Sequence, residues 1–549
     1  MKRLFLITAI SLFTTVAVFA QVTDIVPADA ITNPLHKANI GKVTFMADTI
    51  PLARYSESDF LKELVMKPGN NLYARVFLGN SLTNYQHRLQ PGLTIEQLNQ
   101  GNYQFAFYID DKLIYQENVN KGAGFARNKN GRTILTVPLI SNRGEDMWSR
   151  HLFSRFMARG GEDALTTGMH QLSIEIRPYV NIPALKVGDI IASGKLKLVV
   201  PAAEAKDIRI QAIRPNSGWP VSTDAYDQKL IMAMNEKIAL NKFKNISGIV
   251  VIKNGKLLLE EYFNGSGRDT LHDPRSVGKT FASAVMGIAI KKGFIKNEYQ
   301  TLNQFYDLKK FKNYSPKKDS VTLKSLLTMS SVFDANDNDD DSPGNENNMY
   351  PTPNWVQFAL DLKTDSSKTA YKSWNYFTAG VVVLGDILNK KVPGGLDKYA
   401  DTKLFKPLGI TNYKWQYTPQ NVPNTAGGIR LRAIDFAKFG QLYKNKGVWN
   451  GKQVIPQSWV QKSFTKQLAL PADVVGPGYY GYLFWNKIYT INNKPYETWY
   501  CTGNGGNKIF VFKDVPLVII VTATAYNEGY AHAQVDKMMQ DYILPAVLK

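Results

Sequence analysis

The chain has 549 residues, a formal net charge of +20 and a hydrophobic content of 44%. This length exceeds what one ordinary hydrophobic core accommodates, so we expect two or more domains, and the apolar content excludes a disordered chain. The basic residues are dispersed and form no long Lys/Arg block. That pattern argues against nucleic-acid binding and favours solubility or attraction to an anionic polymer of the cell envelope.

The first twenty residues have the pattern of a secretory signal peptide. Lys2 and Arg3 precede an apolar stretch that ends in small residues, with Val18 and Ala20 at positions −3 and −1 before Gln21. A membrane anchor is the alternative, but the apolar run is short and ends in a cleavable sequence. We therefore expect an exported protein, periplasmic or extracellular, that keeps no membrane span after signal removal.

Cysteine and histidine usage argues against metal sites. Cys501 is the only cysteine, so neither an intrachain disulfide nor a cysteine-based zinc site can form. The six histidines form no H-x-x-x-H or H-x-H pair. The stretch 333–350 begins like a calcium-binding EF-hand loop, but its glycine and glutamate are out of register, so we expect a solvated acidic loop. We predict no metal and no cofactor.

Residues 21–205 are predicted to form a mostly-β domain. Apolar and polar residues alternate with the period of half-buried strands in three stretches: 103–109, 170–180 and 193–201. The stretch 144–161 breaks this pattern and predicts an amphipathic helix. We expect a β-sandwich with a helical insertion, and no catalytic constellation is visible in it.

A linker precedes the second predicted domain, residues 206–549. Asn254–Gly255 joins two apolar runs and is a strong hairpin signal, because a type I′ turn needs φ > 0 at both central residues. A second strand pair follows in 508–524, a terminal helix in 530–547, and helical segments fill the middle. Strands from the two ends of the domain can then form one antiparallel sheet covered by helices, so the fold class is α+β.

Serine and lysine stand three residues apart at three places, namely Ser276–Lys279, Ser315–Lys318 and Ser463–Lys466. Ser315 lies in a Lys-rich turn with no apolar helix behind it, and Ser463 lies in a polar stretch. Only Ser276 opens a long apolar run of helical period, which ends near Gly293. On a helix, the Ser276 hydroxyl and the Lys279 amine can hydrogen-bond, and free N–H groups at the helix start stabilise an oxyanion. A helix-capping serine with a solvated lysine is the alternative.

Two further stretches carry matching chemistry. Tyr376 precedes an apolar helix, with Thr378 two residues on, and a tyrosine there can shuttle the serine proton. Gly503, Gly505 and Gly506 lie in a turn between two strands, where glycine lets the backbone approach a ligand closely. Taken alone, the first stretch could equally be a buried aromatic helix cap and the second a plain hairpin loop.

In this order, the three stretches resemble the serine β-lactamase and penicillin-binding-protein superfamily, above all its class C and esterase-type branch, which includes 6-aminohexanoate-dimer hydrolases. The resemblance covers about residues 220–549 and extends to segments such as "VTLKSLLTMSS", "LFKPLGITNYKW" and "GNGGNKIFVF". It implies a β-lactamase-like α/β sandwich, an antiparallel sheet covered by helices, preceded by the mostly-β N-terminal domain.

The resemblance also implies roles for matching residues. Ser276 would attack a carbonyl to form an acyl-enzyme, and Lys279 and Tyr376 would together activate it and return the proton to the leaving group; which of the two is the formal base stays open. The Ser276 N–H would be one oxyanion donor, and the second would lie on the Cys501–Asn504 stretch. The oxyanion site and substrate shelf would be formed by Cys501, Gly503, Asn504, Gly505 and Gly506. No metal or cofactor is needed.

Two departures from the family pattern bear on the substrate. Thr378 stands where the family usually has Asn or Ser, keeping a hydroxyl but crowding the site. β-Lactamases and DD-peptidases hold a substrate carboxylate with the Lys or His of K/H-T-G, whereas Cys501–Thr502–Gly503 has no such cation in register. Losing a charge-assisted contact of roughly 1.5–3 kcal/mol argues against carboxylate recognition. A displaced cation, Lys508, stays open, and the acidic stretch 333–350 is expected at the rim of the site.

We therefore expect an exported serine hydrolase that cleaves an ester or amide bond of a small or peptide-like substrate. One alternative is a β-lactamase or DD-peptidase-like enzyme that acts on peptidoglycan-type substrates. Another is a non-catalytic envelope-binding protein in which the hydrolase fold is a relic and the β domain binds glycan or anionic polymer.

Overall fold

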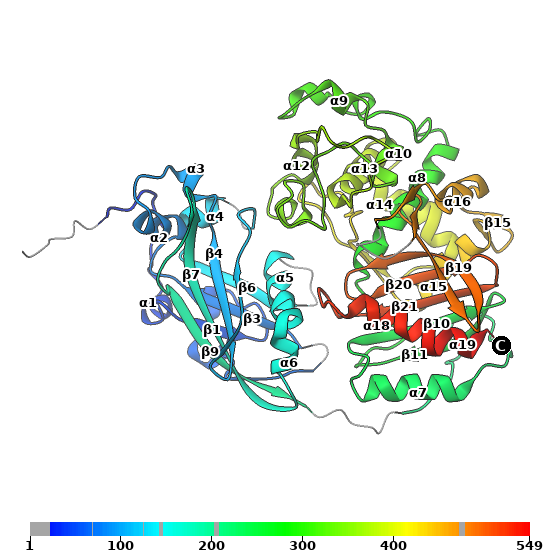
Figure 1. Cartoon of the computed structure of the whole chain (residues 1–549), viewed down its shortest axis with the longest axis horizontal. Coiled ribbons are helices and arrows are strands. Elements are labelled where there is room, and N and C mark those ends of the chain that lie inside the picture. The colour runs from blue at the N-terminus through cyan, green and yellow to red at the C-terminus, as the bar shows by residue number, and fades with distance from the viewer. Residues whose placement is uncertain are drawn as a thin grey trace, which may run out of the picture.

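The computed structural model describes residues 22–67, 70–123, 126–141, 147–201, 208–471 and 478–548. The predicted signal peptide, residues 1–20, and the predicted domain boundary near residue 205 lie outside these residues. Figure 1 shows two bodies side by side, a β-rich N-terminal body and a larger mixed body. Each has its own main cluster of buried apolar side chains. The members of the first cluster lie in the chain from Val43 to Leu198, and those of the second from Trp219 to Val547.

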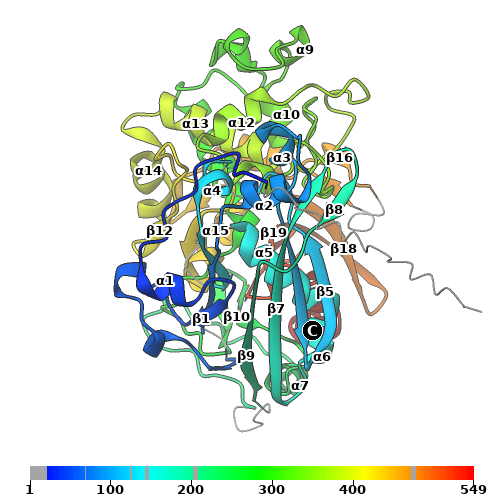
Figure 2. The ribbon, with the colours of Figure 1, turned by 90° about the vertical axis from the view of Figure 1, so that its left-hand side faces the viewer.

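The N-terminal body is built on two sheets. Its strands are β1 (Val43–Met46), β2 (Glu63–Val65), β3 (Leu72–Phe77), β4 (Tyr103–Ile109), β5 (Lys112–Asn118), β6 (Ile134–Ile140), β7 (Gly168–Asn181), β8 (Leu185–Val187) and β9 (Ala192–Val200). One sheet has the order β1-β3-β6 and the other β2-β9-β7-β4-β5, with β8 paired to β7; Figure 2 shows β7 and β9 side by side. Both sheets contribute to one buried cluster, which is the sandwich-like β structure that the alternating sequence predicts.

Helices complete the N-terminal body: α1 (Pro34–Ala38), α2 (Leu82–Leu89), α3 (Ile95–Leu98), α4 (Ala126–Gly131), α5 (Met147–Phe156) and α6 (Glu162–Ala164). Helix α5 lies within the helix predicted for residues 144–161. Its Phe153 and Phe156 rings lie 6.2 and 4.9 Å from the ring of Phe107 on β4, so its apolar face covers the sheet. Regular helix ends before Gly160, whose φ of 118° no α-helix can hold.

The mixed body is organised by one eight-stranded sheet. Its strands are β10 (Ile246–Lys253), β11 (Lys256–Tyr262), β16 (Leu468–Ala469), β17 (Tyr479–Tyr480), β18 (Trp485–Ile491), β19 (Lys494–Gly503), β20 (Asn507–Phe512) and β21 (Leu517–Ala523). The order β11-β10-β21-β20-β19-β18-β17-β16 is antiparallel throughout, and it pairs β10 with β21, the two ends of this part of the chain. Asn254 and Gly255, at φ 54° and 70°, form the tight turn between β10 and β11 that the sequence predicts.

Helices cover both faces of this sheet. They are α7 (Gln228–Ala239), α8 (Lys279–Lys291), α9 (Pro316–Asp319), α10 (Leu323–Leu327), α11 (Glu346–Met349), α12 (Trp355–Asp361), α13 (Thr378–Lys391), α14 (Gly395–Ala400), α15 (Ala433–Lys444), α16 (Gln457–Ser463), α18 (Ala531–Met538) and α19 (Leu544–Val547). Figure 1 shows α7, α18 and α19 on one face, and α9 to α14 gathered in a lobe beyond the sheet. Among the described residues, no helix is both long and apolar enough to cross a membrane. The predicted α+β class is confirmed.

Helix α8 differs from the amphipathic helix that its sequence pattern predicts. Every residue from Lys279 to Ala289 is buried, because helices and the sheet surround it. Phe281 stacks on Phe439 of α15 at 3.9 Å, and a Cβ at Gly287 would lie 2.3 Å from the Trp459 ring of α16. The helix that follows the candidate nucleophile is therefore a rigid central element.

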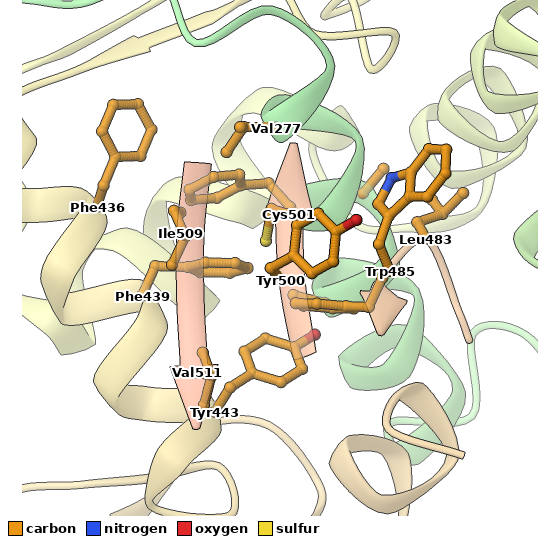
Figure 3. Close-up of a cluster of buried hydrophobic side chains, with 14 of the residues drawn as sticks. Val277, Phe436, Phe439, Tyr443, Leu483, Trp485, Tyr500, Cys501, Ile509 and Val511 are labelled. Carbon is orange, nitrogen blue, oxygen red and sulfur yellow. The ribbon is translucent and has the colours of Figure 1, made fainter. Parts of the chain in front are cut away.

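The core beneath this helix is shown in Figure 3. Phe436, Phe439 and Tyr443 of α15 meet Ile509 and Val511 of β20, next to Cys501 of β19 and Val277 of the nucleophile turn. Aromatic and branched side chains of this kind fill the space between helix and sheet at interior density. They fix the nucleophile turn against the middle strands of the sheet.

Candidate active site

Ser276 lies in a 3₁₀ turn, Arg275–Gly278, that leads into α8 at Lys279. Arg275 has a φ of 53°, a left-handed conformation that is uncommon outside glycine and that often marks functional sites. Ser276 is partly exposed, whereas Lys279 is only 1% exposed. The Lys279 Nζ donates hydrogen bonds to the Ser276 Oγ and to the Ala426 carbonyl, both at 2.7 Å. A buried amine is thus held against an accessible hydroxyl.

Tyr376 comes to the same place from the start of α13. Its hydroxyl hydrogen-bonds with Ser276, and the Lys279 Nζ lies 5.1 Å from the centre of its ring. Burial raises the pKa of Tyr376 above its ordinary value, although the Lys279 charge and the Ser276 hydrogen bond oppose the shift. The phenol is therefore neutral around pH 7 and able to give or pass on a proton. The structure brings Ser276, Lys279 and Tyr376 together.

Aromatic rings hold the Tyr376 side chain in place. Its ring centre lies 6.1 Å from that of Trp374 and 5.9 Å from that of Trp485, which themselves pack at 5.4 Å. Tyr480 packs against both tryptophans, at 5.7 and 5.1 Å. Such edge and tilted contacts restrict a ring to one orientation. This wall also gives the site an aromatic side.

Two glycines flank the backbone of the nucleophile. A Cβ at Gly503, at the end of β19, would lie 1.9 Å from the Pro274 carbonyl and 3.0 Å from the Ser276 nitrogen. A Cβ at Gly427, where φ is 143°, would lie 2.4 Å from the Arg275 carbonyl and 3.1 Å from the same Ser276 nitrogen. Only glycine fits at these positions, because any side chain would push the strand and the loop away from the Ser276 N–H.

The other residues of the predicted shelf lie differently. The Cys501 side chain is buried in the core, and burial raises the pKa of its thiol to about 12, so only its backbone is available to the site. Asn504 bonds through its side chain to Asn527. A Cβ at Gly505 would meet the Tyr526 ring, and one at Gly506 the Ala531 carbonyl at 2.8 Å. These two glycines shape the turn, whereas Gly503 is the one against Ser276.

Lys508 does not replace the cation missing from the third motif. It lies across from Thr502 in the β19–β20 pairing, is 3% exposed, and forms an ion pair with Asp536 at 3.0 Å. Lys487 binds the other oxygen of Asp536 at 2.7 Å. Burial lowers the pKa of Lys508 to about 8. Its charge is already neutralised by a carboxylate, so it is poorly suited to hold a substrate anion.

The acidic stretch 333–350 is more than the solvated rim that the sequence predicts. Asp337 is only partly accessible, and its Oδ2 accepts a hydrogen bond from the Thr378 N–H at 2.7 Å. Its Oδ1 accepts one from the Glu346 N–H at 2.8 Å, and its own N–H donates to the Tyr376 carbonyl at 2.8 Å. No spacing motif indicates this residue, because its partners lie far along the chain. Within the described residues, no group of His, Cys, Asp and Glu is placed to hold a metal ion.

Several neighbouring groups shift the pKa of Asp337. Burial raises its pKa to about 7, the Glu346 charge adds to the shift, and Thr378 and Lys279 oppose it. The Tyr350 hydroxyl donates to the Glu346 carboxylate at 2.7 Å, which holds that side chain at the same site. Thr378 itself is fully buried, and its contact with Asp337 is made by its backbone N–H. Its side chain therefore packs at the base of α13.

Several solved structures are similar to this chain, each at less than 20% sequence identity. No curated protein matches the chain. A Bacillus anthracis protein described provisionally as a 6-aminohexanoate-dimer hydrolase aligns at 19% identity over 61% of this chain and 91% of its own, with a TM-score of 0.48. A penicillin-binding protein homologue of Pyrococcus abyssi aligns at 18% over 58% and 79%, with a TM-score of 0.43. A penicillin-binding protein of Bacillus halodurans aligns at 16% over 53% and 96%, with a TM-score of 0.41.

The family assignment rests on sequence. The Beta-lactamase family model matches residues 241–538, which is more than half of the chain. The matched region contains the Ser276 turn, the start of α13 and the end of β19. This chain therefore belongs to the beta-lactamase family, a family of hydrolases.

Proposed function

We propose that this protein is a serine hydrolase that cleaves an ester or amide through an acyl-enzyme on Ser276. One observation carries the proposal. The Ser276 Oγ accepts a hydrogen bond from the Lys279 Nζ at 2.7 Å, and the Ser276 side chain also shares a hydrogen bond with that of Tyr376. A hydroxyl is a weak nucleophile until a neighbouring group takes its proton, and here two groups are in reach. The partial exposure of Ser276 leaves its oxygen open to a substrate.

The reaction follows from this geometry in two halves. The Ser276 oxygen attacks the carbonyl carbon while its proton passes to the Lys279–Tyr376 pair, and the pair then protonates the leaving alcohol or amine as its bond to carbon breaks. In the second half a water gives its proton to the same pair and attacks the acyl carbon. The bond between that carbon and the Ser276 oxygen then breaks, the serine oxygen takes the proton back from the pair, and the acid is released. Because its pKa is raised, Tyr376 stays protonated around pH 7, so it can pass on its own proton as it takes up another.

The oxyanion of each tetrahedral intermediate needs N–H donors. The Ser276 N–H is one candidate, because Gly427 and Gly503 leave its surroundings free of side chains. The second is expected on the Cys501–Asn504 stretch, whose end runs beside the nucleophile turn. Backbone donors fixed by a strand and a helix start need no reorganisation during the reaction.

The charges around the nucleophile favour substrates without a carboxylate at the scissile end. Cys501 stands where the related enzymes carry a cation, and Lys508 is bound to Asp536. Asp337 and Glu346 place carboxyl groups near Lys279 and Tyr376, where they would repel a substrate anion. An esterase or amidase for neutral substrates fits this arrangement better than a β-lactamase or a DD-peptidase.

Export remains part of the proposal and is supported by the first twenty residues, which have the pattern of a cleavable signal. The net charge of +20 supports loose attraction to an anionic envelope polymer. Cell fractionation with mass spectrometry of the mature N-terminus tests the export. A mature chain that starts at Met1 in the cytoplasm would contradict it.

A fluorophosphonate probe tests the nucleophile. We expect labelling of the wild type and none of Ser276→Ala, and a fall in turnover of p-nitrophenyl acetate on the order of 10⁶-fold, as for removal of the nucleophile in another serine hydrolase. Ser315→Ala is the matched control, because Ser315 also precedes a lysine by three residues but its hydroxyl contacts Thr364. Equal labelling of wild type and Ser276→Ala would reject the proposal.

The same proteins separate the alternatives. Turnover of p-nitrophenyl acetate and butyrate without turnover of nitrocefin supports an esterase, whereas efficient nitrocefin hydrolysis supports a β-lactamase. Retention on peptidoglycan with neither turnover nor labelling would favour a non-catalytic envelope-binding protein.

A further inference from the structure

Asp337 holds the backbone on both sides of the Tyr376–Phe377 pair. Its N–H donates to the Tyr376 carbonyl at 2.8 Å, and its Oδ2 accepts from the Thr378 N–H at 2.7 Å. Its Oδ1 accepts from the Glu346 N–H at 2.8 Å, which ties the same residue to α11. The position of the Tyr376 phenol relative to Ser276 therefore depends on a residue 39 positions earlier in the chain.

Helix α13 has no cap of its own at this end. Phe377 occupies the N-cap position and makes no side-chain cap hydrogen bond. The first N–H groups of a helix lack partners within the helix, and an anion there is favoured by the helix dipole. Asp337 supplies this cap from another loop, so that loop holds the backbone at the start of α13, while the aromatic wall holds the Tyr376 ring.

Asp337 also places negative charge beside the proton-transfer groups. The charge of Lys279 lowers the pKa of Asp337, and the charge of Asp337 raises the pKa of Tyr376. When the Ser276 proton moves onto the Lys279–Tyr376 pair, positive charge grows on the amine, and a fixed carboxylate nearby stabilises that charge. The same carboxylate disfavours the phenolate form of Tyr376.

We propose that Asp337 is a positioning residue of this active site, which holds Tyr376 against Ser276 and stabilises the protonated form of Lys279. This inference rests on the proposed hydrolysis at Ser276 and adds a polar group from outside the sequence motifs to Ser276, Lys279 and Tyr376. Asp337 acts through Lys279 and Tyr376 and needs no contact with the substrate.

The ionisation of Asp337 gives the proposal a signature. The groups that face it are Glu346 and Tyr350 from the α11 region, Lys279 from α8, and Tyr376 and Thr378 at the start of α13. With its pKa raised to about 7, Asp337 loses its charge as the pH falls through 7. The rate of acylation should therefore fall on the acid side of pH 7, and this limb should vanish when the carboxyl group is removed.

The test compares Asp337→Asn, which keeps the shape without the charge, with Asp339→Asn, an exposed carboxylate of the same loop. For p-nitrophenyl acetate between pH 5.5 and 9, we expect Asp337→Asn to lower kcat about 10²-fold at pH 8, the scale of a misplaced catalytic group, with KM within about 3-fold. Its acid limb near pH 7 should disappear, and Asp339→Asn should match the wild type. Asp337→Glu should restore the acid limb in part, since it returns the charge.

Several outcomes would overturn the inference. Wild-type kcat and pH profile in Asp337→Asn would do so, as would a lower kcat with an unshifted acid limb, which a purely structural role produces. If Asp337→Asn does not fold, Asp337→Ser keeps a hydroxyl for the Thr378 N–H and serves in the same measurements. Fluorophosphonate labelling separates the two proposals. Labelling of Ser276→Ala rejects the hydrolase itself. If Ser276→Ala is not labelled but Asp337→Asn is labelled as fast as the wild type, only this inference is rejected.

Discussion

The two bodies of the molecule each bury a lysine, and the two lysines do different things. In the N-terminal body, Lys129 donates to backbone carbonyls, those of Asn99, Gly101 and Lys121, and so ties loops together. In the mixed body, Lys279 donates to one carbonyl and to the hydroxyl of Ser276. A buried cation is costly in both places, so burial alone does not mark a functional site; the chemistry of its partner does.

The same contrast holds within the mixed body. Lys318, from the second Ser–Lys pair, is fully buried and donates to the carbonyls of Lys312 and Leu360. Ser463, from the third pair, is buried and bonds back to the Trp459 carbonyl of its own helix. Only the pair at Ser276 joins amine to hydroxyl at an accessible place.

The two bodies also contact each other at the acidic stretch 333–350. The Asn120 side chain donates to the Asp340 carbonyl at 3.3 Å, and a Cβ at Gly122 would lie 2.3 Å from the Asn348 amide oxygen. Both contacts fall on the acidic stretch 333–350 that carries Asp337. The N-terminal body thus touches the loop that caps α13, although its own apolar cluster is separate.

Replacing each buried lysine by methionine should break the comparison most strongly. Lys279→Met should lower kcat/KM by roughly 10²–10⁴-fold, because the proton-transfer group is lost. Lys129→Met should leave turnover near that of the wild type and lower the free energy of unfolding by about 1–3 kcal/mol, because buried carbonyls lose their donor. Steady-state kinetics and denaturant unfolding measure the two effects. Full turnover in Lys279→Met would remove the lysine from the mechanism.

Acid should lower the stability of the mixed body through His272. This histidine is buried in the mixed body, and burial lowers its pKa to about 4 from an ordinary 6.5. Between these values the unfolded chain binds the extra proton and the folded one does not, so stability is lost as the pH falls from 6.5 to 4, by up to about 3 kcal/mol. Calorimetry at pH 7 and 4.5 should show His272→Gln losing less stability than the wild type. An equal loss in both would assign the acid sensitivity to other groups.

Removing the N-terminal body should have the smallest effect. Because the apolar cluster of the mixed body, together with the side chains that pack against it, contains no residue before Ile210, we expect a fragment of residues 208–549 to fold and to turn over p-nitrophenyl acetate within about 10-fold of the full chain. The residual loss would reflect the missing support for the acidic loop. A fragment that cannot be labelled by a fluorophosphonate, although folded by circular dichroism, would show that the N-terminal body completes the site.

Much of the fold follows from local patterns. Alternation places the strands of the N-terminal body. In the mixed body, Asn254–Gly255 marks the hairpin between β10 and β11, because positive φ at both central positions is needed there. The pattern after Ser276 predicts a helix correctly but not that it is buried all round, since burial on the polar side depends on elements such as α15 and α16. The resemblance placed Cys501 in the substrate shelf, whereas its side chain lies in the core, because which way a strand side chain points depends on register.

The sequence by itself determined the fold class and the family, because hydrophobic periodicity and ordered motifs are written in residues close together in the chain. It also singled out Ser276, Lys279 and Tyr376 as groups of matching chemistry. Only the tertiary structure decided that these three meet, that Lys508 is neutralised by Asp536, and that Asp337 caps α13 beside Tyr376. These are contacts between distant segments, and their energies depend on distance and burial, which no local pattern encodes.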